Sequence, residues 1–232
     1  MIVLVVGNTS DPDSGYVGER LDQRGYVSSF LARDTADPAA PWLLAPRPDL
    51  LLLLGSPWSV HAPVDAAARD AECELVRDAV QDDVAILGLC YGAQIIAAAL
   101  GGRVTLAAQP ECGLAEVDTT APDLVPAGPW VSFHADAIEA PPHAQILARS
   151  PAGVQAFSLP GVLGVQFHPE VRPEILAGWI QRFPDLVSTA APRDRAAGDD
   201  LLARCRDRES VARQGAYDLV DAFLGAAVGS AD

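Results

Sequence analysis

A cysteine flanked by glycines stands where a buried strand is expected to run into a helix. The segment Gly88-Leu89-Cys90-Tyr91-Gly92 ends the apolar run 84–89 and precedes the helix-forming stretch 94–100. Small residues around a nucleophile permit a tight strand-to-helix turn, which presents the side chain at the carboxyl edge of a sheet. A helix N-terminus favours the thiolate of Cys90, and the backbone N–H of Tyr91 is positioned to bind an oxyanion. The alternative is a buried packing cysteine.

A base and a carboxylate, His168 and Glu170, follow a second apolar strand in the segment Gly164–Glu170. Alternate residues of an extended chain project to the same side, and Pro169 restricts the backbone of His168 to the β region. Glu170 can therefore accept a hydrogen bond from one ring nitrogen while the other nitrogen faces a thiol. A surface turn would explain this segment alone, but together with the cysteine turn it predicts a Cys90–His168–Glu170 triad.

The segment Gly55-Ser56-Pro57-Trp58-Ser59 follows the apolar run 50–54. In a doubly wound sheet this loop opens at the same edge as Cys90, where ligands usually bind. A backbone N–H at Gly55 or Ser56 is therefore a candidate second oxyanion donor. The alternative is an ordinary Gly-Ser-Pro turn.

The elements that must position these residues alternate between strands and helices. Continuous apolar runs predict strands buried on both faces, and the helical segments between them predict right-handed crossovers and a doubly wound α/β sheet. We expect strands at 2–6, 27–31, 50–54 and 84–89, and helices at 16–24, 65–79 and 94–100.

From 104 to 171 the chain carries shorter strands with frequent Pro and Gly, which predicts a mixed or antiparallel extension of the sheet. We expect strands there at 114–117, 154–157 and 162–167. Beyond Arg172 the pattern is helical at 173–180 and 209–224, with a polar, mobile loop at 188–200.

Composition excludes several classes of function. All 16 basic residues are Arg, so Schiff-base, pyridoxal-phosphate and Walker-A lysine chemistry are excluded, and the net charge of −15 disfavours nucleic acid as a partner. The four cysteines form no C-x-x-C pair, so neither a metal site nor a disulfide framework is predicted. No run is long enough to span a membrane and the N-terminus lacks a basic signal-peptide region, so we expect a cytoplasmic protein without membrane contact.

The three motifs, in this order, resemble those of the class I (triad-type) glutamine amidotransferases. Gly55–Ser59 resembles the family's G-G-P-x-S loop, Gly88–Gln94 its G-x-C-x-G-x-Q turn, and Phe167–Glu170 its F-H-P-E. Ser132–Asp136 resembles an S-H-G-D stretch near the glutamine site. The resemblance covers about residues 1–182, and within the family it is greatest to stand-alone members related to the glutaminase domain of GMP synthase.

The resemblance implies a flavodoxin-like open mixed sheet with helices on both faces and a cofactor-free glutaminase. Cys90 would attack the side-chain amide of glutamine, His168 would act as base and acid, and Glu170 would orient it. The oxyanion hole would be formed by Tyr91, Ser56 and Gly55, and the substrate contacts by Gln94, Pro57, Trp58, His134, Ala135 and Asp136. Two residues depart from the family pattern: Ser56 replaces the second Gly, and Ala93 replaces a frequent His, which leaves room for a different entrance to the site.

We expect a catalytic domain at 1–182 and a helical extension at 183–232. Because no ATP-binding domain fits in 232 residues, the ammonia acceptor is expected to be a separate synthetase. Two alternatives remain open. One is a hydrolase of γ-glutamyl peptides or γ-glutamyl amines that uses the same triad, and the other is an inactive binding subunit.

Overall fold

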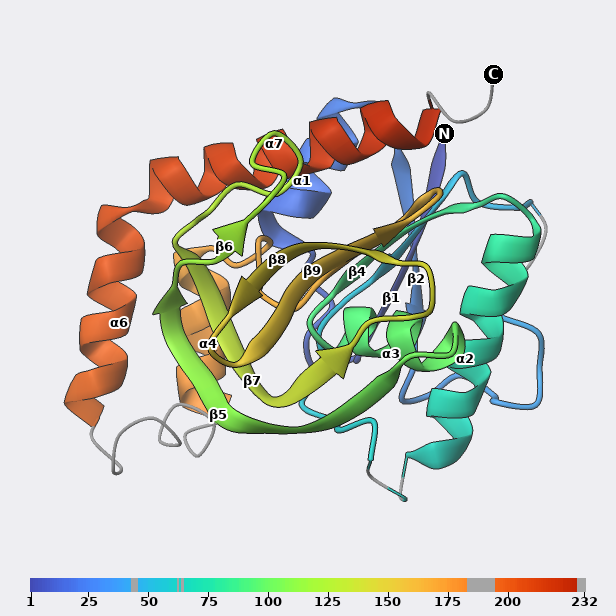
Figure 1. Ribbon diagram of the computed structural model, residues 1–232, viewed down its shortest axis with the longest axis horizontal. Helices are drawn as coiled ribbons and strands as arrows, with labels where there is room; N and C mark the ends of the chain where they lie inside the picture. The colour runs from blue at the N-terminus through green and yellow to red at the C-terminus, as the bar shows by residue number, and fades with distance from the viewer. Residues whose placement is uncertain (43–45, 62, 64, 183–194, 229–232) are drawn as a thin grey trace.

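A single mixed sheet forms the centre of the protein. The structure, a computed structural model, describes residues 1–42, 46–61, 63, 65–182 and 195–228. Within these residues ten strands form one sheet, with the path β2-β1-β3-β4-β10-β9-β7-β5 and with β8 and β6 attached through β9 (Figure 1). The predicted doubly wound α/β architecture with an antiparallel extension is confirmed.

The parallel half of the sheet carries the three motifs at its carboxyl edge. Its strands are β2 (Val27–Ala32), β1 (Ile2–Gly7), β3 (Leu50–Leu53), β4 (Ala85–Leu89) and β10 (Val162–Val165). All neighbours along this path pair in parallel. The chain leaves β3, β4 and β10 at the same edge, which explains how distant segments of sequence meet in one site.

Helices cover both faces of the parallel half, and the residues of β3 divide between the two cores. Leu50 and Leu52 pack with helices α1 (Gly15–Gln23) and α7 (Glu209–Val228). Leu51 and Leu53 pack on the other face with α2 (Ala66–Gln81) and α3 (Tyr91–Ala99). Because alternate side chains of a strand point to opposite faces, a continuous apolar run is the sequence of a strand buried on both sides.

The antiparallel half extends the sheet over the site. It contains β9 (Gly153–Leu159), β8 (Gln145–Ser150), β7 (Trp130–Glu139), β5 (Arg103–Ala115) and the short β6 (Asp118–Thr119). Helices α4 (Pro173–Arg182) and α6 (Arg195–Asp207) pack against β7 and β5 in a third apolar cluster. This half is longer than predicted, because β7 and β8 were not expected as strands and β5 was expected only near 114–117.

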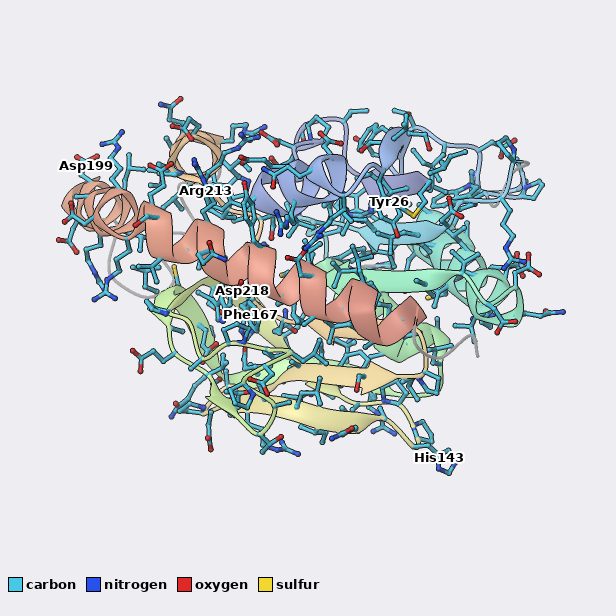
Figure 2. The ribbon with its side chains drawn as sticks, turned by 90° about the horizontal axis from the view of Figure 1, so that it is seen from above. Tyr26, His143, Phe167, Asp199, Arg213 and Asp218 are labelled. Atoms are coloured by element: carbon cyan, nitrogen blue, oxygen red, sulfur yellow. The ribbon has the colours of Figure 1, made fainter. Side chains whose placement is uncertain are left out.

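The C-terminal helices pack onto the rest of the chain. The prediction of a loop at 188–200 is wrong from Arg195 onward, where α6 begins, and 188–194 lies outside the described residues. Figure 2 shows α7 lying lengthwise across the molecule. Arg24 of the segment after α1 forms a 2.6 Å ion pair with Asp221 of α7. Among the described residues we find no helix with the length and apolar character that a bilayer crossing requires.

Candidate active site

Cys90 occupies a strained turn between β4 and α3. Its backbone has φ 50° and ψ −105°, a conformation that costs free energy in a non-glycine residue. A Cβ on Gly92 would lie 2.2 Å from the carbonyl oxygen of Leu53, and a Cβ on Gly88 would lie 2.4 Å from Ile96 Cδ1. Both flanking positions therefore need glycine, as the predicted nucleophile turn requires.

The thiol of Cys90 is only 5% exposed and has polar neighbours. The side-chain amide of Gln166 donates a hydrogen bond to Sγ over 3.5 Å, and the carbonyl oxygen of Phe133 lies 3.8 Å from Sγ. Sequence reasoning assigned no role to Gln166. The alternation that places His168 and Glu170 on one side of an extended chain also places Gln166 there, and this was the available signal.

His168 and Glu170 form the hydrogen-bonded pair that their spacing predicts. His168 Nδ1 lies 2.7 Å from Glu170 Oε1, and both side chains are buried. The backbone N–H of His168 donates to the carbonyl oxygen of Val131, and the carbonyl oxygen of Glu170 accepts from the N–H of Tyr16. These backbone bonds hold the two residues on either side of Pro169, so the carboxylate can fix the orientation of the imidazole.

Charge around His168 favours its protonated form. Burial opposes protonation, but the interactions with Cys90 and Glu170 outweigh it and raise the pKa of His168 well above its ordinary value.

Trp179 of α4 borders the imidazole on another side. The rings of His168 and Trp179 meet edge to face, with their centroids 4.7 Å apart. The indole N–H of Trp179 donates to Asp11 Oδ2 over 2.6 Å, which fixes the indole. The fixed indole of Trp179 therefore restrains the imidazole in addition to the hydrogen bond to Glu170.

Gly55 brings the third motif against the other two. A Cβ at Gly55 would lie 2.9 Å from His168 Cε1 and 3.7 Å from Cys90 Cβ. The adjacent Ser56 hydroxyl donates to Asn8 Oδ1 over 2.8 Å and accepts from the N–H of Trp58. The Ser56 side chain is thus committed to holding its own loop, and only the backbone of this segment remains available as an oxyanion donor.

A cavity of about 240 Å³ opens beside Cys90. Nine of the predicted site residues line it: Ser56, Pro57, Trp58, Cys90, Tyr91, Gln94, His134, Ala135 and Asp136. Four further residues complete the lining: Ser59, Leu106, Glu111 and Phe133. Across the described residues, no group of three or more His, Cys, Asp or Glu side chains is arranged to hold a metal ion.

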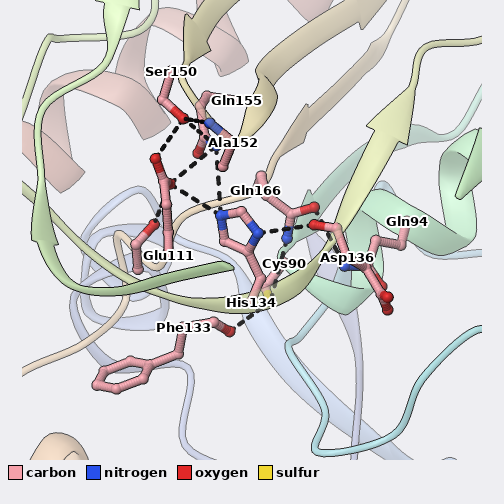
Figure 3. Close-up of polar contacts among 11 residues, drawn as sticks. Cys90, Gln94, Glu111, Phe133, His134, Asp136, Ser150, Ala152, Gln155 and Gln166 are labelled. Atoms are coloured by element: carbon pink, nitrogen blue, oxygen red, sulfur yellow. Dashed lines mark hydrogen bonds and ion pairs between the residues drawn. The ribbon is translucent and has the colours of Figure 1, made fainter. Parts of the chain in front are cut away.

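Gln94 reaches the thiol indirectly. Its Nε2 donates to Gln166 Oε1 over 3.3 Å, and Gln166 in turn donates to Cys90 (Figure 3). Gln94 is 3% exposed and borders the cavity. It lies where a substrate contact was predicted, but its amide also supports Gln166.

His134 belongs to a buried polar network around Glu111 (Figure 3). Its Nδ1 lies 2.9 Å from the carbonyl oxygen of Asp136, and its Nε2 lies 3.1 Å from Glu111 Oε2. Glu111 also accepts from Ser132, Ser150 and Gln155. Burial opposes ionisation of Glu111, but the bonds from His134 and Ser150 outweigh it and lower its pKa. The network ties β5, β7, β8 and β9 together behind Phe133 and was not predicted.

Asp136 links β7 to the loop after β3. Its Oδ2 accepts from the Ser59 hydroxyl over 3.2 Å, and its Oδ1 lies 3.9 Å from His61 Nε2. The Asp136 carboxylate therefore faces the mouth of the cavity rather than the thiol. Ala135, between His134 and Asp136, contributes to the wall.

Ala93 does not widen the entrance. Ala93 is 0% exposed and packs in the core cluster that contains residues of α2 and α3. A Cβ built on Gly164 would lie 3.3 Å from the Cβ of Ala93. A residue that faces the core beneath the sheet cannot shape the mouth of the cavity. The expectation attached to this departure from the family pattern is wrong.

Fold, site geometry and sequence together define the class of this protein. The model of the class-I glutamine amidotransferase family matches residues 18–178, and the chain belongs to that family.

The proteins to which this chain is similar in sequence include GMP synthases. It is 33% identical over 197 residues to a glutamine-hydrolysing GMP synthase of Aeropyrum pernix, covering 79% of this chain and 35% of that enzyme. It is 35% identical over 134 residues to one subunit of the glutamine-hydrolysing GMP synthase of Sulfurisphaera tokodaii, covering 53% of this chain and 68% of that subunit. The chain thus spans about a third of the length of the Aeropyrum enzyme.

Solved structures share the fold along almost the whole chain. A glutamine amidotransferase of Thermotoga maritima superposes with a TM-score of 0.82 at 20% identity, covering 97% of this chain and 98% of that one. A glutamine amidotransferase of Methylobacillus flagellatus gives a TM-score of 0.81 at 22% identity, covering 97% and 94%. At these identities the comparison establishes the fold.

Proposed function

We propose that this chain is a glutaminase in which Cys90, His168 and Glu170 hydrolyse the side-chain amide of glutamine. The observation that carries the proposal is that the Cys90 turn, which borders the cavity, lies beside the buried His168–Glu170 pair, since a Cβ on Gly55 would approach both His168 Cε1 and Cys90 Cβ. Membership of the class-I glutamine amidotransferase family supports the side-chain amide of glutamine as the group that is hydrolysed.

The proposed reaction begins with attack of the Cys90 sulfur on the amide carbon. The C–S bond forms, and the negative charge on the amide oxygen is stabilised by the N–H of Tyr91 and a backbone N–H of the Gly55–Ser56 segment. His168 gives its proton to the amide nitrogen, the C–N bond breaks and ammonia leaves. Water, losing a proton to His168, then attacks the γ-glutamyl thioester. The C–S bond breaks, which restores the thiolate–imidazolium pair and forms the γ-carboxylic acid, and this acid loses its proton to solvent to give glutamate.

The ammonia is proposed to pass to a synthetase on a separate chain. The similarity to a GMP synthase that is divided into subunits supports an acceptor carried by another polypeptide. An ammonia supplier gains by closing or misaligning its site without its partner, so we expect slow but measurable turnover by the isolated chain.

The alternative substrates have less support. The sequence leaves larger γ-glutamyl compounds open because Ala93 and the altered loop at Ser56 both depart from the family pattern. Ala93 is buried in the core and leaves no room at the entrance, whereas Ser56 lines the cavity. The third reading, an inactive binding subunit, does not explain why Cys90 keeps a strained backbone beside a buried His168–Glu170 pair.

The test compares kcat/KM of the purified chain for glutamine with values for γ-glutamyl dipeptides and γ-glutamyl amines. We expect glutamine to be preferred, with glutamate and ammonia released in equal amounts and no turnover by Cys90→Ala. A preference for the larger compounds of more than about tenfold, or ~1.4 kcal/mol in transition-state binding, would make the γ-glutamyl hydrolase the better assignment. Absence of turnover and of any reaction with a glutamine-analogue electrophile would favour the binding subunit.

A further inference from the structure

An arginine that follows β2 is buried beneath the active-site loop. Arg33 is 0% exposed, and its Nη2 forms a 2.9 Å ion pair with Glu72 of α2, which is also 0% exposed. Removing two charges from water is costly, and buried ion pairs often stabilise a protein less than apolar side chains of the same size. Stability alone is therefore a weak explanation for this pair.

The guanidinium of Arg33 holds the segment after β3 at consecutive residues. Nη2 donates to the carbonyl oxygen of Leu54 over 3.0 Å, and Nη1 donates to the carbonyl oxygen of Gly55 over 2.9 Å. Nη1 also donates over 3.1 Å to Asn8 Oδ1, the same atom that accepts the Ser56 hydroxyl. Arg33 thus fixes Leu54 and Gly55 directly and Ser56 through Asn8.

The same guanidinium contacts the other side of the proposed oxyanion site. Its Cζ lies 4.9 Å from the centroid of the Tyr91 ring, a cation–π contact with the residue next to Cys90. One buried group therefore contacts both segments whose N–H groups are proposed to bind the oxyanion: the backbone carbonyls of Leu54 and Gly55, and the side chain of Tyr91.

We propose that Arg33 is a positioning residue that sets the spacing between the Gly55–Ser56 segment and Tyr91, so that both N–H groups reach the developing oxyanion. Glu72 neutralises the charge of Arg33. Oxyanion donors act only when they are preorganised, and a shift of about 1 Å is enough to cost activity. The inference rests on the proposed glutaminase function.

The experiment separates oxyanion binding from thiol reactivity. Alkylation of Cys90 by iodoacetamide needs a reactive thiolate but no oxyanion hole, whereas glutamine hydrolysis needs both. Two variants are compared with the unmodified chain: Arg33→Lys keeps the charge but loses the planar fork, and Arg33→Met with Glu72→Met removes the pair without leaving an unpaired charge. Leu219→Ala in α7 is the stability-matched control, because it creates a cavity in the core cluster on the opposite face of the sheet from α2.

We expect both Arg33 variants to lose ~10- to 10²-fold in kcat, while KM and the alkylation rate stay within about threefold. Leu219→Ala should lower the melting temperature and keep kcat. A folded Arg33 variant with kcat within threefold of the unmodified chain would overturn the inference, as would a loss of alkylation that parallels the loss of kcat. If neither Arg33 variant folds, Asn8→Ala is measured instead. A loss of kcat without a matching loss of alkylation rate supports the inference, and a kcat within threefold of the unmodified chain overturns it. Failure of the unmodified chain to hydrolyse glutamine would instead overturn the proposed function, and this inference with it.

Discussion

The side-chain amide of Gln166 lies 3.5 Å from the sulfur of Cys90 and donates its N–H to it. The donor is held in place, because Gln94 Nε2 donates to the Oε1 of the same amide. Gln166 is 0% exposed, so the bond acts without competition from water. We expect this donor to stabilise negative charge on the sulfur of the proposed nucleophile.

Replacing Gln166 is expected to weaken the thiolate. Gln166→Leu should slow alkylation of Cys90 at neutral pH about tenfold, because a hydrogen bond to a charged group contributes roughly 1.5 kcal/mol or more. Gln166→Glu should be slower still, since a carboxylate beside the sulfur repels its negative charge. The measurement is the rate of Cys90 alkylation by iodoacetamide as a function of pH.

Gln94→Leu, which leaves the Gln166 donor in place, is the control. It should raise KM for glutamine more than it changes the alkylation rate. Equal rates for the two Gln166 variants and the unmodified chain would show that the hydrogen bond does not activate the thiol.

Cys90 is expected to be the thiol that a glutamine-analogue electrophile modifies. Burial raises the pKa of the other three thiols, Cys73, Cys112 and Cys205, to about 11, so very little of each is ionised at neutral pH. Intact-mass measurement should find one modification per chain. Cys90→Ala should abolish labelling and Cys112→Ala should retain it. Stoichiometric labelling of Cys90→Ala would refute the assignment.

The parallel half of the fold could be predicted because its strands are buried on both faces. The runs Leu50–Leu53 and Ala85–Leu89 are continuously apolar and end at recognisable turns. The antiparallel half was harder to predict. In β5 the residues are half-exposed, Pro110 and Gly113 interrupt the pattern, and an irregularity in the pairing between Leu106 and Glu111 accommodates the proline.

Arg33 and Glu111 could not be predicted as site residues, because their contacts form only in the folded chain. Cys90, His168 and Glu170 could be proposed from the sequence because the features that mark them, the flanking glycines and the His-Pro-Glu spacing, lie one or two positions away. Arg33 meets Gly55 and Tyr91 only after the sheet has formed, and Glu111 meets His134 only across β5 and β7. No local spacing marks either residue, and α6 was missed because its polar, alanine-rich start resembles a loop.

His168 and Glu170 are expected to differ in how much activity their loss costs. His168→Ala should lower kcat by at least ~10³, because the proton donor and acceptor is removed. Glu170→Gln should cost less, because the backbone hydrogen bond of His168 to Val131 and the restricted backbone at Pro169 still restrain the imidazole. Glu174→Gln, an exposed carboxylate in α4, is the control and should leave kcat unchanged. A greater loss for Glu170→Gln than for His168→Ala would reverse the roles assigned here.

The raised pKa of His168 predicts a pH dependence of its protonation. The interactions with Cys90 and then Glu170 hold the proton against the effect of burial. In the unmodified chain the imidazole should therefore remain protonated well above pH ~6.5, the ordinary value for histidine. Removing either negative partner, by Cys90→Ala or Glu170→Gln, should lower the midpoint. Imidazole nitrogen chemical shifts measured by NMR across a pH titration report this directly.

The proton held by His168 should also make the free energy of unfolding depend on pH. Because the folded state holds the His168 proton and the unfolded state loses it above pH ~6.5, the stabilisation by Glu170 is complete below that pH. It is lost as pH rises through the folded pKa, with a slope of at most about 1.4 kcal/mol per pH unit. The difference in unfolding free energy between the unmodified chain and Glu170→Gln, measured by urea denaturation, should shrink as pH rises from 6.5. A difference that stays constant or grows over this range would mean that Glu170 does not hold a proton on His168.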